Sequence, residues 1–275
     1  MVLATVFALM AAGLHAGWNL RVKASGDRFV ALWGQFLTAG ALCAAAMLVA
    51  GPPARVAWPW IALSASIHLP YVVCLARAYD HGDFSLAYPI ARGGGALAAA
   101  IGGLVLLDDR LSVLGWLAIA VITGGLMSFV RPGTTWPHIR WALLVALLIG
   151  GYTLADAAGA RRTEGVAYVL GTFLATGIVV SAYGFARGHW SAMRASMAID
   201  WRRHLTSGLA SAVAYGLVLY AVRWAPVGYV TALRESSVVL AAIAGWRLLA
   251  EGLGRARVAS AGVVCSGLVL LVIAR

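Results

Sequence analysis

The amino-acid sequence has 275 residues, of which 62% are hydrophobic and 11% are charged. Soluble domains carry about 25% charged residues and about 45–50% apolar residues, so this composition excludes a soluble protein. Lysine and arginine total 21 against 10 acidic residues, which gives a formal net charge of +11. The basic residues lie in short connections between apolar runs. There they indicate membrane topology and contacts to anionic lipid, and they disfavour nucleic-acid binding.

Apolar runs long enough to cross a membrane occur ten times along the chain. A membrane helix needs about 20 predominantly apolar residues. The predicted spans are 2–20, 29–50, 57–78, 84–107, 111–130, 139–159, 166–186, 204–223, 227–249 and 256–274. The sequence therefore predicts an all-α integral membrane protein with ten transmembrane helices. The long connection 188–203 predicts an amphipathic segment at the membrane surface, with a plain basic loop as the alternative.

An internal repeat relates the two ends of the chain. With a shift of 142 positions, residues 91–111 match residues 233–253 at eight of 21 positions, and Arg92 falls on Arg234. A weaker correspondence aligns residues 34–37 with residues 171–174, and another aligns Trp18-Asn19 with Tyr152-Thr153.

The repeat unit contains five predicted helices, so the chain enters on one face of the membrane and leaves on the other. The second copy must then lie upside down relative to the first, as in many secondary transporters. The predicted organisation is two inverted five-helix repeats, residues 1–131 and 139–275, joined by a linker at 132–138.

Three ionisable residues, Arg92, Arg234 and Glu235, fall deep inside predicted spans. At about 1.5 Å per residue each lies roughly 11–12 Å along its helix, where a charge costs at least about 2.5–3.5 kcal/mol. We expect them to face a protein interior or a wet cavity. In one interpretation the arginines bind a carboxylate or phosphate, and Glu235 balances their charge when substrate is absent. The alternative is a structural ion pair between Glu235 and one arginine.

Further candidates for substrate contact lie on other predicted spans, and for each the alternative is interhelical hydrogen bonding or packing. These candidates are His15, Trp18, Asn19, Tyr71, Tyr88 and Tyr152. Tyr88 and Pro89 precede a glycine triplet at 93–95, which predicts a broken or kinked helix that lines a cavity; close packing against small residues is the alternative.

Two acidic residues, Glu235 and Asp156, are candidates for proton coupling. For Asp156 the alternative is a surface ion pair with Arg161 or Arg162. The sequence contains no H-E-x-x-H, G-x-S-x-G or C-x-x-C motif. It therefore predicts that the protein is not an enzyme and binds no metal or cofactor, although a membrane enzyme or scaffold remains the alternative from another functional class.

Several segments resemble the EamA-type family of the drug/metabolite transporter superfamily. These segments are residues 14–19 (LHAGWN), 85–93 (SLAYPIARG), 225–226 (AP), 232–237 (ALRESS) and 248–255 (LLAEGLGR). The resemblance implies a secondary transporter of the bacterial inner membrane, usually an exporter of amino acids, metabolites or toxic compounds. It also implies a cavity lined by the first, third, fourth, sixth, eighth and ninth helices, which carry the candidate site residues.

The residues and the resemblance together predict an alternating-access exporter of a small metabolite, such as an amino acid or another carboxylate. The expected partners are this substrate, membrane lipid and a proton as coupling ion, in a monomer or a dimer. The alternative is a polyspecific exporter of cationic or neutral toxic compounds. The distribution of basic residues favours both termini outside the cytoplasm. The family pattern implies the opposite orientation.

Overall fold

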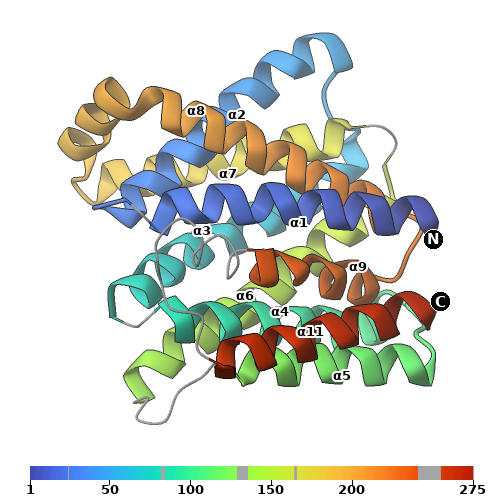
Figure 1. The fold of residues 1–275 in the computed structure, drawn as a ribbon. Coiled ribbons are helices and arrows are strands. Elements are labelled where there is room, and N and C mark those ends of the chain that lie inside the picture. The colour runs from blue at the N-terminus through green and yellow to red at the C-terminus, as the bar shows by residue number, and fades with distance from the viewer. Residues whose placement is uncertain (24, 82–83, 129–135, 164–165, 241–254, 275) are drawn as a thin grey trace.

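The computed structural model describes the whole chain except residues 24, 82–83, 129–135, 164–165, 241–254 and 275. The described residues form helices and connections without strands, and the helices run back and forth between two ends of the molecule (Figure 1). Both termini lie at the same end. The helices are α1 (Val2–Lys23), α2 (Arg28–Ala50), α3 (Trp58–His81), α4 (Phe84–Leu106), α5 (Val113–Met127), α6 (Trp136–Arg161), α7 (Ala167–Ala186), α8 (Trp190–Ala221), α9 (Val227–Arg234) and α11 (Arg255–Ile273), with a short 3-10 turn at Arg55–Ala57.

Each predicted span contains a helix among the described residues, so the all-helical class is confirmed for that part of the chain. Six of these helices are long and apolar enough to cross a membrane. Shorter apolar helices occupy Ile90–Leu106, Val113–Met127 and Ala259–Ile273. The count of ten spans stays a prediction. Helix α6 begins at Trp136, so the last residues of the predicted linker 132–138 are helical.

The eighth and ninth predicted spans differ from the helices that form. Helix α8 begins at Trp190 and continues through most of the predicted connection 188–203, so the plain-loop alternative is wrong. A bend at Asp200, with φ −107° and ψ 16°, separates this first part from the membrane-spanning part. In the ninth span, α9 ends at Arg234, Glu235 forms a turn, and residues 236–240 are helical again.

The glycine triplet at 93–95 does not break its helix, because α4 is continuous from Phe84 to Leu106. A side chain at Gly94 would come within 2.8 Å of the Ala146 Cβ atom, and one at Gly95 within 2.7 Å of Ile149. Small residues therefore bring α4 and α6 into close contact, as is common between membrane helices. The close-packing alternative is correct here. The turn at Glu235, where α9 ends, was not predicted.

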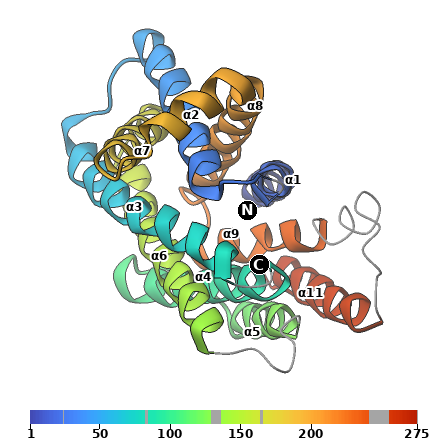
Figure 2. The same cartoon turned by 90° about the vertical axis from the view of Figure 1, so that its left-hand side faces the viewer.

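The helices pack in a regular pattern. Helix α1 packs against α8 and α3 against α6, while α2 packs against α7, α5 against α11 and α4 against α9. Seen from one end, α1, α2, α7 and α8 gather on one side and α4, α5, α9 and α11 on the other, with α3 and α6 between them (Figure 2). The core between these groups holds the charged residues that the sequence placed deep in the membrane.

One carboxylate holds three connections together at the end of the molecule where α4 and α6 finish. Asp109 Oδ1 lies 2.8 Å from Arg161 Nη1, and Asp109 Oδ2 accepts a 2.6 Å hydrogen bond from the Val227 amide at the start of α9. Arg161 Nε donates to the Val222 carbonyl at 2.7 Å. Because Pro226 offers no side-chain cap to α9, Asp109 supplies the anion that a helix N-terminus favours.

We expect the substitution Asp109→Asn to lower stability by about 1.5–3 kcal/mol, because it removes the charge from two hydrogen bonds that are largely shielded from water. Thermal unfolding in detergent measures the effect. The matched control is Asp108→Asn, an exposed neighbour at φ 54°, a backbone conformation that asparagine tolerates. Equal unfolding temperatures for both variants would contradict the structural role of Asp109.

Candidate functional site

A small cavity of about 40 Å³ lies in the protein core, where α1, α2, α3, α6, α7, α8 and α9 meet. Its volume suits about one water molecule. The lining residues are His15, Trp18, Leu32, Gln35, Phe36, His68, Tyr71, Tyr152, Phe173, Ser211, Ala214, Tyr215 and Arg234. Five of the nine predicted contact residues are among them: His15, Trp18, Tyr71, Tyr152 and Arg234.

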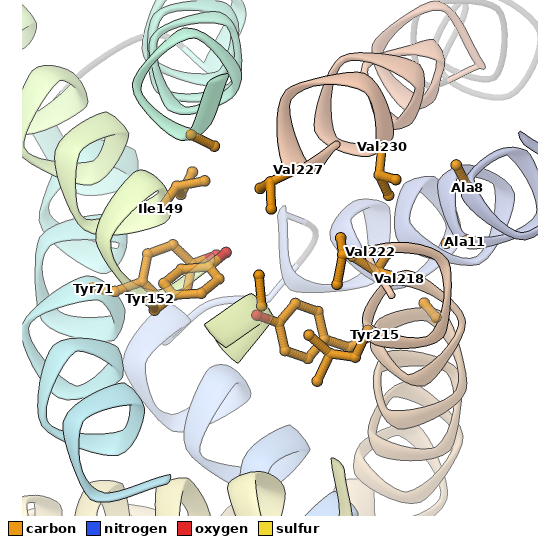
Figure 3. Close-up of a cluster of buried hydrophobic side chains, with 14 of the residues drawn as sticks. Ala8, Ala11, Tyr71, Ile149, Tyr152, Tyr215, Val218, Val222, Val227 and Val230 are labelled. Atoms are coloured by element: carbon orange, nitrogen blue, oxygen red, sulfur yellow. The ribbon is translucent and has the colours of Figure 1, made fainter. Parts of the chain in front are cut away.

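Aromatic rings from three helices form one wall of this cavity. The rings of His68 and Tyr152 stack with centroids 4.1 Å apart, and Tyr71 meets Tyr152 edge-on at 5.2 Å. Tyr215 approaches Tyr152 from α8 at 6.1 Å (Figure 3). Offset and edge-on contacts of this kind are favourable and orient the rings. The wall therefore offers flat apolar surface and phenol hydroxyls from fixed positions.

Arg92 and Glu235 form a buried ion pair beside the cavity. Arg92 Nη2 lies 2.7 Å from Glu235 Oε1, and Arg92 Nε donates to Oε2 at 3.2 Å. The side chains are 5% and 2% exposed, so water hardly screens the pair. This two-pronged geometry is the strongest form of a carboxylate–guanidinium contact. Neither residue lines the cavity. Of the two interpretations of the sequence, the structure therefore contains the ion pair between Glu235 and one arginine.

Arg234 is arranged differently from its repeat partner Arg92. It lines the cavity, is 4% exposed, and its guanidinium carbon lies 5.9 Å from the centroid of the Tyr215 ring. Within the described part of the chain, its Nε atom has no hydrogen-bond partner. Arg92, Arg234 and Glu235 together carry one excess positive charge. Arg234 therefore presents a buried cation with an unused donor to the cavity.

Asp156 is fully buried behind the aromatic wall. Its carboxylate accepts hydrogen bonds from the hydroxyls of Tyr168, at 2.8 Å, and Tyr215, at 2.6 Å. The predicted surface ion pair is wrong, because Arg161 pairs with Asp109 and the Arg162 guanidinium lies 4.8 Å over the Trp60 ring.

The polar face predicted on the first helix is only partly directed at the cavity. His15 and Trp18 line it and meet edge-on, with centroids 4.7 Å apart. Asn19 does not line it, and its amide nitrogen donates to the His15 carbonyl of the same helix at 2.9 Å. Tyr88 belongs to α4, but its side chain lies outside the described part of the structure. The alternative predicted for Asn19 was a hydrogen bond to another helix, but its amide nitrogen forms a hydrogen bond within α1.

Several residues that line the cavity were not predicted from the sequence, and one of them, Gln35, is polar. Gln35 is 1% exposed, and neither its amide nitrogen nor its amide oxygen has a partner among the described residues. One signal was available, because the weaker repeat correspondence aligns Phe36 with Phe173, and these rings lie 6.2 Å apart beside the cavity. Leu32, Ser211 and Ala214 carry no comparable signal in the sequence.

The described residues contain no cluster of three or more histidine, cysteine, aspartate or glutamate side chains that could hold a metal ion. What they do contain is an acid, Asp156, at the hydroxyl of Tyr215 and a cation, Arg234, over the ring of the same residue. Such an arrangement suits recognition of a polar solute within a largely apolar core.

We expect Tyr168→Phe to lower stability by about 1.5–3 kcal/mol, because it removes a hydroxyl that donates a hydrogen bond to the buried Asp156 carboxylate. Tyr183→Phe is the matched control on the same helix, since the Tyr183 ring packs against Phe29 and its hydroxyl is not needed for that contact. Thermal unfolding of both variants at one pH gives the comparison. A Tyr168→Phe protein as stable as the control would show that this hydrogen bond contributes little.

Comparison with known proteins agrees with the helical architecture. The EamA-like transporter family matches residues 136–273, about half of the chain. A search of curated proteins finds no match. A solved structure titled "Crystal structure of protein" aligns with a TM-score of 0.77 and 17% identity over 99% of this chain and 97% of that chain, a likeness in fold. The chain belongs to the EamA-like transporter family and is a multi-pass membrane protein of the drug/metabolite transporter superfamily.

Proposed function

We propose that this protein is a secondary transporter that exports a small carboxylate-bearing metabolite, such as an amino acid, across a bacterial inner membrane. The observation that carries the proposal is Arg234, a buried guanidinium that faces a cavity and has an unused donor. A buried cation is costly unless an anion pairs with it. A substrate carboxylate would supply that anion, and the aromatic wall would contact the apolar part of the substrate.

The packing pattern supports two inverted repeats, residues 1–131 and 139–275. A shift by five helices converts the contact of α1 with α8 into the contact of α6 with α3, and both contacts are present. The pairs α2 with α7, α5 with α11 and α4 with α9 each join a helix to its own repeat partner. Contacts of this kind are expected around a two-fold axis in the membrane plane, where transporters of this architecture bind substrate.

The size of the cavity favours alternating access over a fixed binding pocket. Pockets for small molecules measure about 300–1,000 Å³. At about 40 Å³ the cavity is too small for a metabolite and must widen before substrate binds. The Arg92–Glu235 pair spans the two proposed halves, since Arg92 lies on α4 and Glu235 follows α9. An anion bound at Arg234 would weaken the hold of the arginines on Glu235 and let the halves separate.

Substitution of Arg234 tests the binding role. We expect Arg234→Gln to fold and to bind the substrate about 10-fold to 100-fold more weakly, because charge-assisted hydrogen bonds contribute about 1.5–3 kcal/mol. Arg234→Lys should recover part of the affinity, since it keeps the charge but not the planar fork. Amino acids and other small carboxylates are first screened for thermal stabilisation of the purified protein. The strongest stabiliser is then used in counterflow assays with proteoliposomes.

The control for this experiment is Arg187→Gln, an exposed arginine at the end of α7 that should leave counterflow unchanged. A folded Arg234→Gln protein that exchanges substrate like the wild type would refute the carboxylate-binding role. Truncation of Arg92 is a less direct test, because it leaves Glu235 buried and unpaired at a cost of about 3–5 kcal/mol.

We further propose that Asp156 carries the coupling proton, with Glu235 as the second candidate. In Asp156→Asn the side-chain oxygen still accepts a hydrogen bond from a tyrosine, but the side chain no longer releases a proton. We therefore expect this variant to keep substrate exchange and to lose accumulation driven by a proton gradient. Asp200→Asn, at the exposed bend of α8, is the control. If the Asp156→Asn protein still accumulates substrate in a proton gradient, Asp156 does not carry the coupling proton and Glu235 becomes the candidate.

A second candidate function, export of cationic or neutral toxic compounds, is favoured by one observation. Most of the cavity lining is aromatic or apolar, with Trp18, Phe36 and Phe173 beside the tyrosines. Cations bind well to aromatic faces, but Arg234 would repel them. Thermal stabilisation by lipophilic cations and by no acid would favour this second function over carboxylate export.

A further inference from the structure

A second cavity, separate from the central one, lies between α2, α7 and α8, with Phe7 of α1 at its side. It is a groove of about 440 Å³, more than sufficient for a slender apolar ligand. Its walls are made of aliphatic and aromatic side chains, among them Leu42, Val169 and Leu217, and Arg223 is the one charged residue among the described residues that line it. The groove has no counterpart in the proposed transport function.

The groove opens on the lipid-facing side of the bundle. Val166, Leu209 and Val213 line it and are 55%, 52% and 45% exposed. From Leu209 to its end at Ala221, helix α8 extends about 18 Å at about 1.5 Å per residue, and Arg223 follows it. One leaflet accounts for half of a hydrocarbon layer of about 30 Å, which is less than the length of this part of α8. The groove is therefore deep enough to span one membrane leaflet.

The end of the groove at Arg223 has the features of a membrane–water boundary. Tyr220 and Trp224 are 38% and 49% exposed there and meet edge-on, with centroids 4.4 Å apart. Tyrosine and tryptophan are enriched at this depth. Arg223 Nε donates to the Ala160 carbonyl at 2.8 Å, which fixes the guanidinium group at the mouth. Its two terminal nitrogens make no hydrogen bond within the described part of the chain and remain available as donors.

The chemistry that complements this site is a hydrocarbon chain with an anionic group at one end. We propose that the groove binds an anionic phospholipid, with one acyl chain between α7 and α8 and the phosphate at Arg223. A guanidinium fork matches phosphate, and basic positions beside membrane helices attract anionic headgroups. Tyr168 forms part of the groove wall, and its hydroxyl binds Asp156. The bound lipid therefore contacts a residue that supports the buried carboxylate.

Two substitutions separate the acyl-chain contact from the headgroup contact. A Cβ atom at Gly216 would meet Val169 at 3.7 Å, an ordinary contact, so Gly216→Leu fills the groove without displacing backbone. Arg223→Gln removes the charge at the mouth. Gly124→Leu and Arg110→Gln are matched controls, because Gly124 has open space around it and Arg110 is exposed outside the groove.

The full-length protein is reconstituted in nanodiscs that contain phosphatidylglycerol or phosphatidylcholine with a photoreactive acyl chain, and the labelled peptides are mapped. We expect phosphatidylglycerol to label segments 166–170 and 209–217, and Gly216→Leu to reduce this labelling about fivefold. Arg223→Gln should reduce the preference for phosphatidylglycerol over phosphatidylcholine by about fivefold, since a basic residue near a membrane surface contributes about that factor in affinity. Both controls should label like the wild type.

Three results would overturn the proposal. Labelling could spread evenly over all lipid-facing helices, the lipid preference could survive in a folded Arg223→Gln protein, or the groove segments could crosslink to a second copy of the chain. Thermal unfolding verifies that each variant is folded. If Gly216→Leu does not fold, the Arg223→Gln result still decides, because that substitution is confined to the mouth of the groove, where it removes the charge and the contact to the Ala160 carbonyl.

Discussion

The ion pair between Arg92 and Glu235 is the interaction on which the core depends. Removing two charges from water is expensive, and close two-pronged contact is what compensates for it. The pair lies where α4 meets the turn after α9, with distances of 2.7 and 3.2 Å. Because Glu235 is committed to Arg92, the neighbouring Arg234 forms no ion pair with another carboxylate among the described residues. The same pair therefore holds the helices together and leaves an uncompensated cation at the cavity.

Tyr215 connects the two charged parts of the site. Its hydroxyl donates to Asp156 at 2.6 Å, and its ring lies beneath the Arg234 guanidinium at 5.9 Å. A solute that displaces Arg234 would act on the ring whose hydroxyl binds the acid. Hydrogen bonds in a core of low polarity strengthen one another, so a change at one end alters the other. The proposed sites of anion binding and of protonation thus share one aromatic residue.

The sequence predicted the helices well and the partners of the charged groups poorly. Apolar runs fix where a span begins and ends, and the repeat placed Arg92 and Arg234 at equivalent depths. Which arginine takes Glu235 depends on the rotation of α4 against α9, which no local pattern records. The alternative considered for Asp156 was a pair with a nearby arginine, yet its partners Tyr168 and Tyr215 lie 12 and 59 residues away. The bend at Asp200 and the break at Glu235 arise inside otherwise helical sequence.

Helix α4 and the residues that follow it join the proposed halves at two levels. Arg92 meets Glu235 near the middle, and Asp109, beyond the end of the helix, meets Arg161 and the Val227 amide. From Arg92 to Leu106 the helix extends about 21 Å, so the two contacts restrain it at well-separated points. A rocking movement that keeps the Asp109 contacts must open the opposite end, toward the start of α4, and must break the Arg92 pair first. In the proposed mechanism, where an anion releases Glu235, the order of these contacts along one helix would therefore set which end opens.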